Sequence, residues 1–451
     1  MAAVDTVDQA KLVLNSFAAI FQNNLLSSDL VTWRKFDNEM NDRNALTVVE
    51  QVTPRYVVTH TTNAVQDLTS SGTQNSVYGS EQYKVQDIFG ASLGWQDFVK
   101  IRDIGAARES EALKGAAMNL AEQIDAYILG FCVNASNNWT GTAGDPISQY
   151  NDVATGYTRL KEEGVDDGDM RAVLNYYDKQ SLGAQVVNQN PGAQSGNASL
   201  QGMGMGVYRN GWEGSIAGIP ALFTQQLPVF ATGTHGTSSV TTASQNVDYV
   251  TAAISSAPGN YLTQTINLTI GVGTETLLDG EVFTIANVYA YDNRLQAPLP
   301  HLQQFRVIGN YTATAGAVTG VRIFPAIIVP NTGAIVASNQ NNNTAHATVS
   351  AVPAAAAVIT YQAAASGTYR PRLIMNKDAV VVSTADLIMP ATGIGSRKSL
   401  TKLPLSIRMW QNSIFNTGEH QVRFDVALSA NVKDRRRICR INGTTGSDAG
   451  N

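Results

Sequence analysis

Two long segments of the chain repeat apolar residues at three- and four-residue steps, the spacing of one face of a helix. In residues 8–24 the apolar positions are Ala10, Val13, Leu14, Phe17, Ile20 and Phe21. In residues 104–133 they are Leu113, Leu120, Ile124, Tyr127, Ile128 and Phe131. This spacing predicts two amphipathic helices, and alanines between the apolar positions of the second raise its helix propensity. The first helix needs a partner surface, on its own domain or on a neighbouring molecule.

Other segments follow the alternating pattern of strands. Residues 47–99 begin and end with β-branched, extended stretches around a polar middle with glycines, which predicts a long hairpin or extended loop that projects from the body. Residues 236–370 contain short alternating runs separated by turn residues, which predicts a β sandwich or barrel. The residues on either side of 236–370 read as mixed helix and strand. We therefore expect an α+β fold with an inserted all-β domain.

The core of that inserted domain can be read from the inward positions of its alternating runs. The expected core residues are Leu268, Ile270, Phe283, Ile285, Phe305, Val307, Val321, Ile323 and Val358. A β domain with a core of its own could fold alone.

Composition narrows the class of protein. The 451 residues are enough for two or three domains, and 43% hydrophobic residues are enough for ordinary cores. Charged residues make up only 15%, well below the roughly 25% of typical soluble domains. Such a surface has little charge repulsion and suits extensive contact with other copies. The net charge of −5 argues against a protein that wraps DNA, whereas a shell around DNA should be near neutral or acidic.

The two cysteines, Cys132 and Cys439, lie far apart and outside any Cys-x-x-Cys pair, so a disulfide framework and a zinc knuckle are not expected. Two buried thiols are the ordinary alternative.

The N-terminal segment carries acids where a signal peptide needs bases, and no run approaches the ~20 apolar residues of a membrane span. We therefore expect synthesis in the cytoplasm and no membrane partner.

No pattern of catalytic, cofactor-binding or metal-ligating residues stands out. The five histidines are isolated. The acidic run at 166–169 lacks the closing Glu of a calcium loop, which favours a solvated turn. The Gly-Met repeat at 202–206 lacks the Lys-Ser/Thr of a phosphate loop, which favours a plain loop. The run Arg435–Arg437 fits contact with nucleic acid or a strand end that faces acidic neighbours.

The order of elements and three stretches of sequence resemble a known family. The stretches are 214–236 (GSIAGIPALFTQQLPVFATGTHG), 268–292 with 303–328, and 418–443 (GEHQVRFDVALSANVKDRRRICRING). They are similar to tailed-phage capsid proteins of the Hong Kong 97 fold, and more closely to the coat proteins of short-tailed enterobacterial phages, which carry an inserted domain. The chain departs from the family pattern at Asp279–Gly280, where the order is reversed. It also departs at Ala430–Asn431, where the family has Gly, and at Arg435–Arg437, where it has Arg-Pro-Glu.

The resemblance implies a major capsid protein that assembles as hexamers and pentamers into the icosahedral shell around a double-stranded DNA genome. It implies the following parts: an N-terminal arm (1–46), an extended loop (47–99), a peripheral domain with a spine helix (100–145), an axial domain (146–235), the inserted barrel (236–370), and the closing axial and peripheral strands (371–451). Partners would be a scaffolding protein, a portal protein, possible decoration proteins and packaged DNA without sequence-specific contact. The location would be the virion, after assembly in the host cytoplasm.

Five residues are candidates for contacts between subunits. Phe17 and Phe21 lie on the arm helix, Tyr78 lies in the extended loop, and Asp292 and Arg294 lie in a proline-stiffened loop at 289–301 of the inserted domain. A merely solvated loop is the alternative for 289–301. For the whole chain the alternatives are an encapsulin-like shell protein, which usually lacks a large inserted domain, and a β-rich surface adhesin, which needs an export signal.

Overall fold

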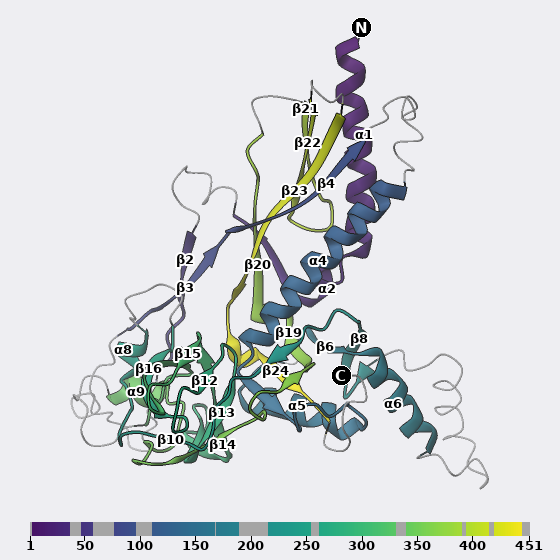
Figure 1. Ribbon diagram of the computed structural model, residues 1–451. Helices are drawn as coiled ribbons and strands as arrows, with labels where there is room; N and C mark the ends of the chain where they lie inside the picture. Colours follow the sequence, from purple (N-terminus) through teal and green to yellow (C-terminus); the bar gives the residue numbers. More distant parts are fainter. Residues whose placement is uncertain are drawn as a thin grey trace, which may run out of the picture. The chain divides into compact units, whose positions relative to one another are not determined.

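The computed structural model in Figure 1 describes most of the chain as two compact units, which are treated separately below. The first unit comprises Met1–Val48, Tyr83–Phe131 and Lys377–Lys433, and the second comprises Val49–Gln82, Cys132–Asn376 and Asp434–Asn451. The described residues are 2–36, 47–56, 76–95, 111–166, 168–188, 215–253, 261–330, 340–389, 394–414 and 419–443. The Gly-Met repeat at 202–206 and His60 lie outside them.

The first unit is built on a sheet whose central strand is β23 (Glu419–Val432). The strand order is β1 (Thr32–Lys35), β20 (Val380–Ala385), β23, β22 (Ser406–Ile414) and β21 (Ile394–Ser399), with β4 (Asp87–Trp95) also paired to β23. Every residue of β23 from Phe424 to Ala430 is buried, so this part of the strand is covered on both faces of the sheet. The length of β23 allows different strands to pair with its two halves.

Helices α1 (Ala2–Asn24), α2 (Ser27–Leu30) and α4 (Glu111–Ala135) complete the first unit, although the last residues of α4 belong to the second. The predicted helix at 8–24 is confirmed and begins earlier, whereas the start of the predicted helix at 104–133 lies outside the described residues. Helix α1 packs on β21 and β22. The carboxylate of Asp125 on α4 accepts hydrogen bonds from the backbone N–H groups of Leu26 and Ser27, at 2.8 and 2.9 Å. This contact holds α4 against the turn that follows α1.

The predicted loop at 47–99 is extended at both ends. Strands β2 (Thr47–Val52) and β3 (Gly79–Lys84) form a two-stranded sheet. Residues 57–75, which include most of the polar middle, lie outside the described residues. Strand β4 pairs with β23 along its whole length and therefore belongs to the sheet of the first unit.

The second unit contains a six-stranded sheet flanked by helices α5 (Tyr150–Glu162) and α6 (Tyr176–Asn188). Its strand order is β5 (Asn138–Thr140), β24 (Ile438–Ile441), β19 (Arg372–Asn376), β6 (Met170–Leu174), β8 (Ile219–Phe223) and β7 (Ser215–Ile216). Helices and strands are both present in this part of the chain, as the mixed pattern before 236–370 predicts.

An ion pair is buried inside this second unit, between Asp178 at the start of α6 and Arg372 on β19. The guanidinium Nε lies 3.1 and 2.8 Å from the two carboxylate oxygens. The same carboxylate accepts hydrogen bonds from the backbone N–H groups of Ile147 and Asn175, at 3.1 and 2.8 Å. Both side chains are almost completely buried. A buried carboxylate with this many donors is fully hydrogen-bonded, as a charge removed from water must be.

The inserted β domain is a closed barrel, as predicted. Its strand order is β10 (Ser238–Val240), β11 (Gln264–Thr269), β16 (Ala317–Phe324), β14 (Ala297–Ile308), β13 (Val282–Asp292) and β17 (Val358–Tyr361), which pairs with β10. Shorter elements of the same unit are α8 (Tyr249–Ala253), α9 (Gln340–Ala345), β12 (Thr276–Leu277) and β15 (Tyr311–Thr312).

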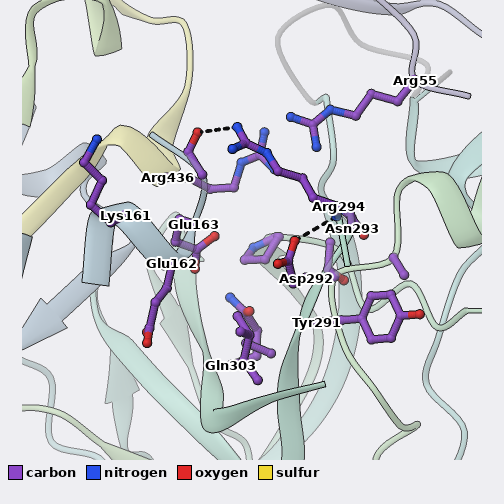
Figure 2. Close-up of a pocket in the computed structure, with 16 residues that line it drawn as sticks. Arg55, Lys161, Glu162, Glu163, Tyr291, Asp292, Asn293, Arg294, Gln303 and Arg436 are labelled. Atoms are coloured by element: carbon purple, nitrogen blue, oxygen red, sulfur yellow. Dashed lines mark hydrogen bonds between the residues drawn. The ribbon is translucent and has the colours of Figure 1, made fainter. Parts of the chain in front are cut away.

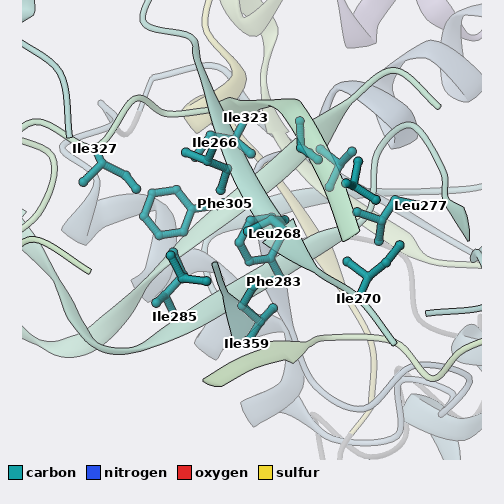
Figure 3. Packing of buried hydrophobic residues seen from close by; sticks show 14 of the residues in the cluster. Ile266, Leu268, Ile270, Leu277, Phe283, Ile285, Phe305, Ile323, Ile327 and Ile359 are labelled. Carbon is teal, nitrogen blue, oxygen red and sulfur yellow. The ribbon is translucent and has the colours of Figure 1, made fainter. Parts of the chain in front are cut away.

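Figure 3 shows the packing of the barrel core, in which Phe283 and Phe305 have ring centroids 5.8 Å apart. Eight of the nine predicted core residues are buried. The ninth, Val358, was predicted wrongly, because it is 56% exposed and its neighbour Ile359, 5% exposed, takes the inward position. In a strand a one-residue offset moves a side chain to the opposite face.

The chain leaves and re-enters the rest of the second unit at one place. Just before the barrel, β9 (Phe230–Ala231) pairs antiparallel with β18 (Thr368–Tyr369), which lies just after it.

Both cysteines are buried, and burial raises the pKa of each thiol to about 12. Among the described residues, no helix combines the length and the apolar character needed to cross a membrane.

Candidate functional site

The turn between β13 and β14 holds the predicted loop residues Asp292 and Arg294. Asp292 pairs with Ala297 across the hairpin, and its carboxylate accepts a hydrogen bond from the backbone N–H of Arg294 at 2.7 Å. This bond closes the turn in the manner of an aspartate that bonds to backbone two residues ahead. The next residue, Leu295, is 79% exposed. The tip therefore presents a guanidinium and an exposed aliphatic side chain together.

Arg294 also contacts its own chain at the end of α5. Its Nη2 donates a hydrogen bond to the carbonyl oxygen of Gly164 at 3.1 Å. Gly164 follows the helix with φ +79°, a conformation that glycine adopts readily after a helix end. A cation is favourable there, because the last carbonyls of a helix carry partial negative charge. This exposed hydrogen bond ties the turn to the residues that follow α5.

A pocket of about 200 Å³ lies between this turn and α5 (Figure 2). Figure 2 shows the guanidinium of Arg55 directed toward those of Arg294 and Arg436. The labelled lining residues are Arg55, Lys161, Glu162, Glu163, Tyr291, Asp292, Asn293, Arg294, Gln303 and Arg436. They come from the start of the 47–99 segment, α5, the β13–β14 hairpin and the turn before β24.

The cations of the pocket differ in how they are paired. Arg436 makes a two-point contact with Asp434, with Nε and Nη2 each 3.1 Å from a carboxylate oxygen. Among the residues that the structure describes, the guanidinium of Arg55 has no hydrogen-bond partner. Partial burial, followed by the nearby positive charges of Arg436 and Arg294, lowers the pKa of Arg55. Among the described residues, the pocket therefore holds two guanidinium groups, those of Arg55 and Arg294, that form no ion pair with a carboxylate.

The two carboxylates at the end of α5 that line the pocket, Glu162 in its last position and Glu163 at its C-cap, are directed to other partners. Glu162 lies 3.1 Å from the Nδ1 atom of His301, and Glu163 lies 3.7 Å from the guanidinium of Arg159. Burial raises the pKa of Glu163. Neither carboxylate neutralises Arg55.

The side chain of His346 binds the backbone of Arg55. Its ring stacks on Tyr249, with centroids 3.6 Å apart, and its Nε2 accepts a hydrogen bond from the backbone N–H of Arg55 at 3.2 Å. Only the neutral imidazole can accept that bond. Burial, and then the charge of Arg55, lowers the pKa of His346 to about 4.

We expect the subunit to lose stability on acidification through His346. Because the folded-state pKa is about 4 and the unfolded value is 6.5, this contribution is complete above pH 6.5 and is lost as the pH falls to 4. The loss should be on the order of 3 kcal/mol. Urea unfolding at pH 4.5 and 7 would measure it in the wild type and in His346→Asn. If the free energy of unfolding of His346→Asn falls between pH 7 and 4.5 as much as that of the wild type, His346 is not the source of the acid sensitivity.

A second polar cluster, the barrel junction, joins the barrel to the six-stranded sheet of the same unit. It consists of Arg306, Asp279, Gln304, Arg440 and Trp139. Nη2 of Arg306 lies 3.0 and 2.9 Å from the two carboxylate oxygens of Asp279, and its Nε donates to the carbonyl of Asn134. The side-chain amide of Gln304 bonds to both the N–H and the C=O of Trp139, each at 2.8 Å.

Arg440 completes the barrel junction as a buried cation. It donates to the carbonyl of Gly280 and stacks over the rings of Trp139 and Phe230, at 4.7 and 4.5 Å from their centroids. Burial lowers its pKa to about 9. Aromatic faces and carbonyl oxygens thus replace water around this guanidinium.

The predicted contact residues lie in two different places. Phe17 and Phe21 are buried in the first unit, where the ring of Phe17 stacks on Phe424 with centroids 3.9 Å apart. The apolar face of α1 therefore packs on its own sheet. Tyr78, which is 51% exposed, and the pair Asp292 and Arg294 all belong to the second unit.

Sequence patterns missed the role of Arg55 and only partly indicated that of Arg436. Arg55 stands in a segment expected to project, and no local signal places it beside residue 294. For the run Arg435–Arg437, the interpretation as a strand end that faces acidic neighbours fits the structure, because Arg436 and Arg437 both lie near Asp434. Among the described residues no group of three or more His, Cys, Asp or Glu side chains could hold a metal ion.

Comparison with known proteins places the chain among the coat proteins of tailed-phage capsids. Residues 2–438 match the family model "P22 coat protein - gene protein 5", and the chain belongs to this family. It is a major capsid protein, copies of which assemble into the phage shell. Its location is accordingly the virion. No curated protein sequence matches the chain.

Solved capsids with weak similarity span most of the chain. The capsid of cyanophage P-SCSP1u has 10% identity and a TM-score of 0.41, covering 94% of this chain and 89% of that one. Mycobacterium phage Che8 has 9% identity and a TM-score of 0.42, with coverages of 92% and 90%. The capsid of Ralstonia phage GP4 has 8% identity and a TM-score of 0.40, with coverages of 94% and 89%. At these values the family assignment rests on the family model alone.

Proposed function

We propose that the chain assembles as hexamers and pentamers into an icosahedral shell around double-stranded DNA, with the β13–β14 turn at a contact between neighbouring subunits. The observation that carries the contact is the composition of the turn: Arg294 and Leu295 are both exposed at the tip of the β13–β14 hairpin, and Leu295 is 79% exposed. Arginine and large apolar side chains are enriched in protein interfaces. Family membership favours this function over an encapsulin-like shell or a surface adhesin.

We expect purified wild-type protein to form closed shells, visible by negative-stain electron microscopy, and Asp292→Ala with Arg294→Ala to reduce them. Each exposed ionic contact is worth only about 0–1 kcal/mol, but a shell repeats it in every subunit. The double variant should therefore fold normally yet give unstable shells or tubes. Val272→Ala, at another exposed barrel turn, is the matched control. Stable shells of normal size from the double variant would show that the turn does not take part in a contact between subunits.

The remaining parts of the proposal concern partners and the division of the chain. Assembly would take place in the host cytoplasm with a scaffolding protein and a portal protein, and decoration proteins could bind the finished shell. The net charge of −5 suits packaged DNA that is held without sequence-specific contact. The protein would have no catalytic role. Arm (1–46), extended loop (47–99), spine-helix domain (100–145), axial parts (146–235 and 371–451) and inserted domain (236–370) remain the proposed division.

A further inference from the structure

Two cations without an ion-pair partner meet at one end of the pocket in Figure 2. The guanidinium of Arg55 is directed toward those of Arg294 and Arg436. Asp434 neutralises Arg436 through a two-point contact, whereas no carboxylate of the described residues forms an ion pair with Arg55 or Arg294. Like charges held in one pocket repel each other until an anion lies between them.

The pKa of Arg55 reflects the same repulsion. Partial burial lowers this pKa, and the positive charges of Arg436 and Arg294 lower it further, while the charge of Asp434 opposes them. An arginine side chain nevertheless keeps its proton at neutral pH. Arg55 therefore stays charged, and an anion that enters the pocket relieves the repulsion directly.

The arginine end of the pocket is also open to an anion from outside. Arg55 and Arg294 take part in lining a shallow hollow next to the pocket. None of the residues that line this hollow carries a carboxylate: Arg55, Tyr56, Asn293, Arg294, Gln296 and Ala345. An anion can therefore reach the two guanidiniums without passing an acidic side chain. The acidic residues of the pocket itself, Glu162, Glu163 and Asp292, are engaged with the partners described above.

The number and type of the unpaired cations select the class of anion. A guanidinium binds phosphate oxygens through a planar fork of N–H donors. A phosphate that is free or linked to a single group carries about −1.5 to −2 charges at neutral pH, which matches two unpaired arginines. A carboxylate or chloride ion carries one charge. Each phosphate of a DNA duplex also carries only one, and the duplex is far wider than this pocket.

We propose that the end of the pocket formed by Arg55 and Arg294 binds a phosphate dianion, either inorganic phosphate or the phosphate of a small phosphomonoester. The bound dianion joins Arg55, which follows β2, to the β13–β14 turn that carries Arg294. This inference concerns a single subunit and does not depend on assembly, so the unassembled subunit is the protein to test.

Isothermal titration calorimetry with inorganic phosphate measures the affinity, and glycerol phosphate in a second titration distinguishes a phosphomonoester from the free anion. We expect Arg55→Gln and Arg294→Gln each to raise the Kd for phosphate about tenfold or more, the usual effect of losing a hydrogen bond between charged groups. The control is Arg370→Gln, which removes an exposed arginine of the same unit and should bind like wild type.

Thermal unfolding followed by circular dichroism separates binding from a purely structural role of Arg55. In buffer without phosphate, Arg55→Gln should have a Tm equal to or above that of wild type, because the substitution removes a repelled charge. Phosphate should raise the Tm of wild type more than potassium chloride at the same ionic strength does, and this additional rise should be lost in Arg55→Gln.

Three results would overturn the proposal. The first is an equal rise of the wild-type Tm in chloride, which would show that screening alone relieves the repulsion. The second is unchanged phosphate affinity in both glutamine variants, or a Tm of Arg55→Gln below wild type without phosphate. The third is binding of a DNA duplex that depends on Arg55 and Arg294, with no binding of inorganic phosphate or glycerol phosphate. That result would assign the two arginines to the DNA backbone instead.

Discussion

Replacing Asp178 with alanine should lower the free energy of unfolding by about 3–5 kcal/mol, the usual effect of removing one partner from a buried ion pair. The change leaves the guanidinium of Arg372 buried without its carboxylate, and it also removes the acceptor for the N–H groups of Ile147 and Asn175. Urea unfolding of the unassembled subunit, followed by circular dichroism, is the measurement. The matched control is Asp166→Ala, an exposed aspartate of the same unit.

A paired substitution separates the charge from the packing at this site. Asp178→Leu with Arg372→Met removes both charges at once, and we expect it to be more stable than Asp178→Ala alone, because no buried ion is left unpaired. If Asp178→Ala and its exposed control unfold at the same urea concentration, the ion pair does not stabilise the fold as described.

Replacing Arg306 with methionine should lower the free energy of unfolding by about 2–4 kcal/mol. This effect is smaller than the one expected for Asp178→Ala, because the partner of Arg306, Asp279, is partly exposed and can be hydrated. The change breaks the two-point contact with Asp279 and frees the carbonyl of Asn134 at the barrel junction. Arg370→Met, an exposed arginine of the same unit, is the control. Urea unfolding again provides the measurement.

The barrel itself should survive the loss of Arg306. Its core is apolar and includes Phe283 and Phe305, whereas the junction residues Gln304 and Arg306 flank Phe305 in β14 and are not part of that apolar cluster. We therefore expect protease digestion of Arg306→Met to release an intact barrel fragment more readily than from wild type. Equal resistance to digestion, together with an unchanged urea midpoint, would show that the barrel junction does not hold the barrel in place.

Local patterns predicted the elements of this fold well, because helices and alternating strands are set by residues close in sequence. The helix at 8–24 and the β barrel within 236–370 are predicted in this way. The prediction that Val358 points into the barrel core was wrong. Strand β17 is only four residues long, so its pattern offers too few positions to fix which face is buried. The partner surface of α1 could not be predicted either, since Phe17 meets Phe424 only in the folded first unit.

The candidate site was less accessible to sequence reasoning than the fold. Asp292 and Arg294 could be proposed from a turn with charges and prolines, but the contact of Arg294 with Gly164 joins residues 130 positions apart. Arg55 belongs to a segment whose pattern indicated only an extended loop. Contacts of this kind depend on how distant elements pack, and one sequence contains no local signal for them.

The pairing of β9 with β18 bears on how coat proteins of different size can arise. Because Phe230 pairs with Tyr369 and Ala231 with Thr368, the polypeptide enters and leaves the barrel through a stem whose ends are already joined. For a flexible loop, doubling the length adds only about 0.6 kcal/mol to the entropy of closure. Insertions at exposed barrel turns, which leave the stem and the barrel junction intact, should therefore perturb the rest of the unit little. Gene fusion at such a turn is a practical route to display foreign domains on the subunit.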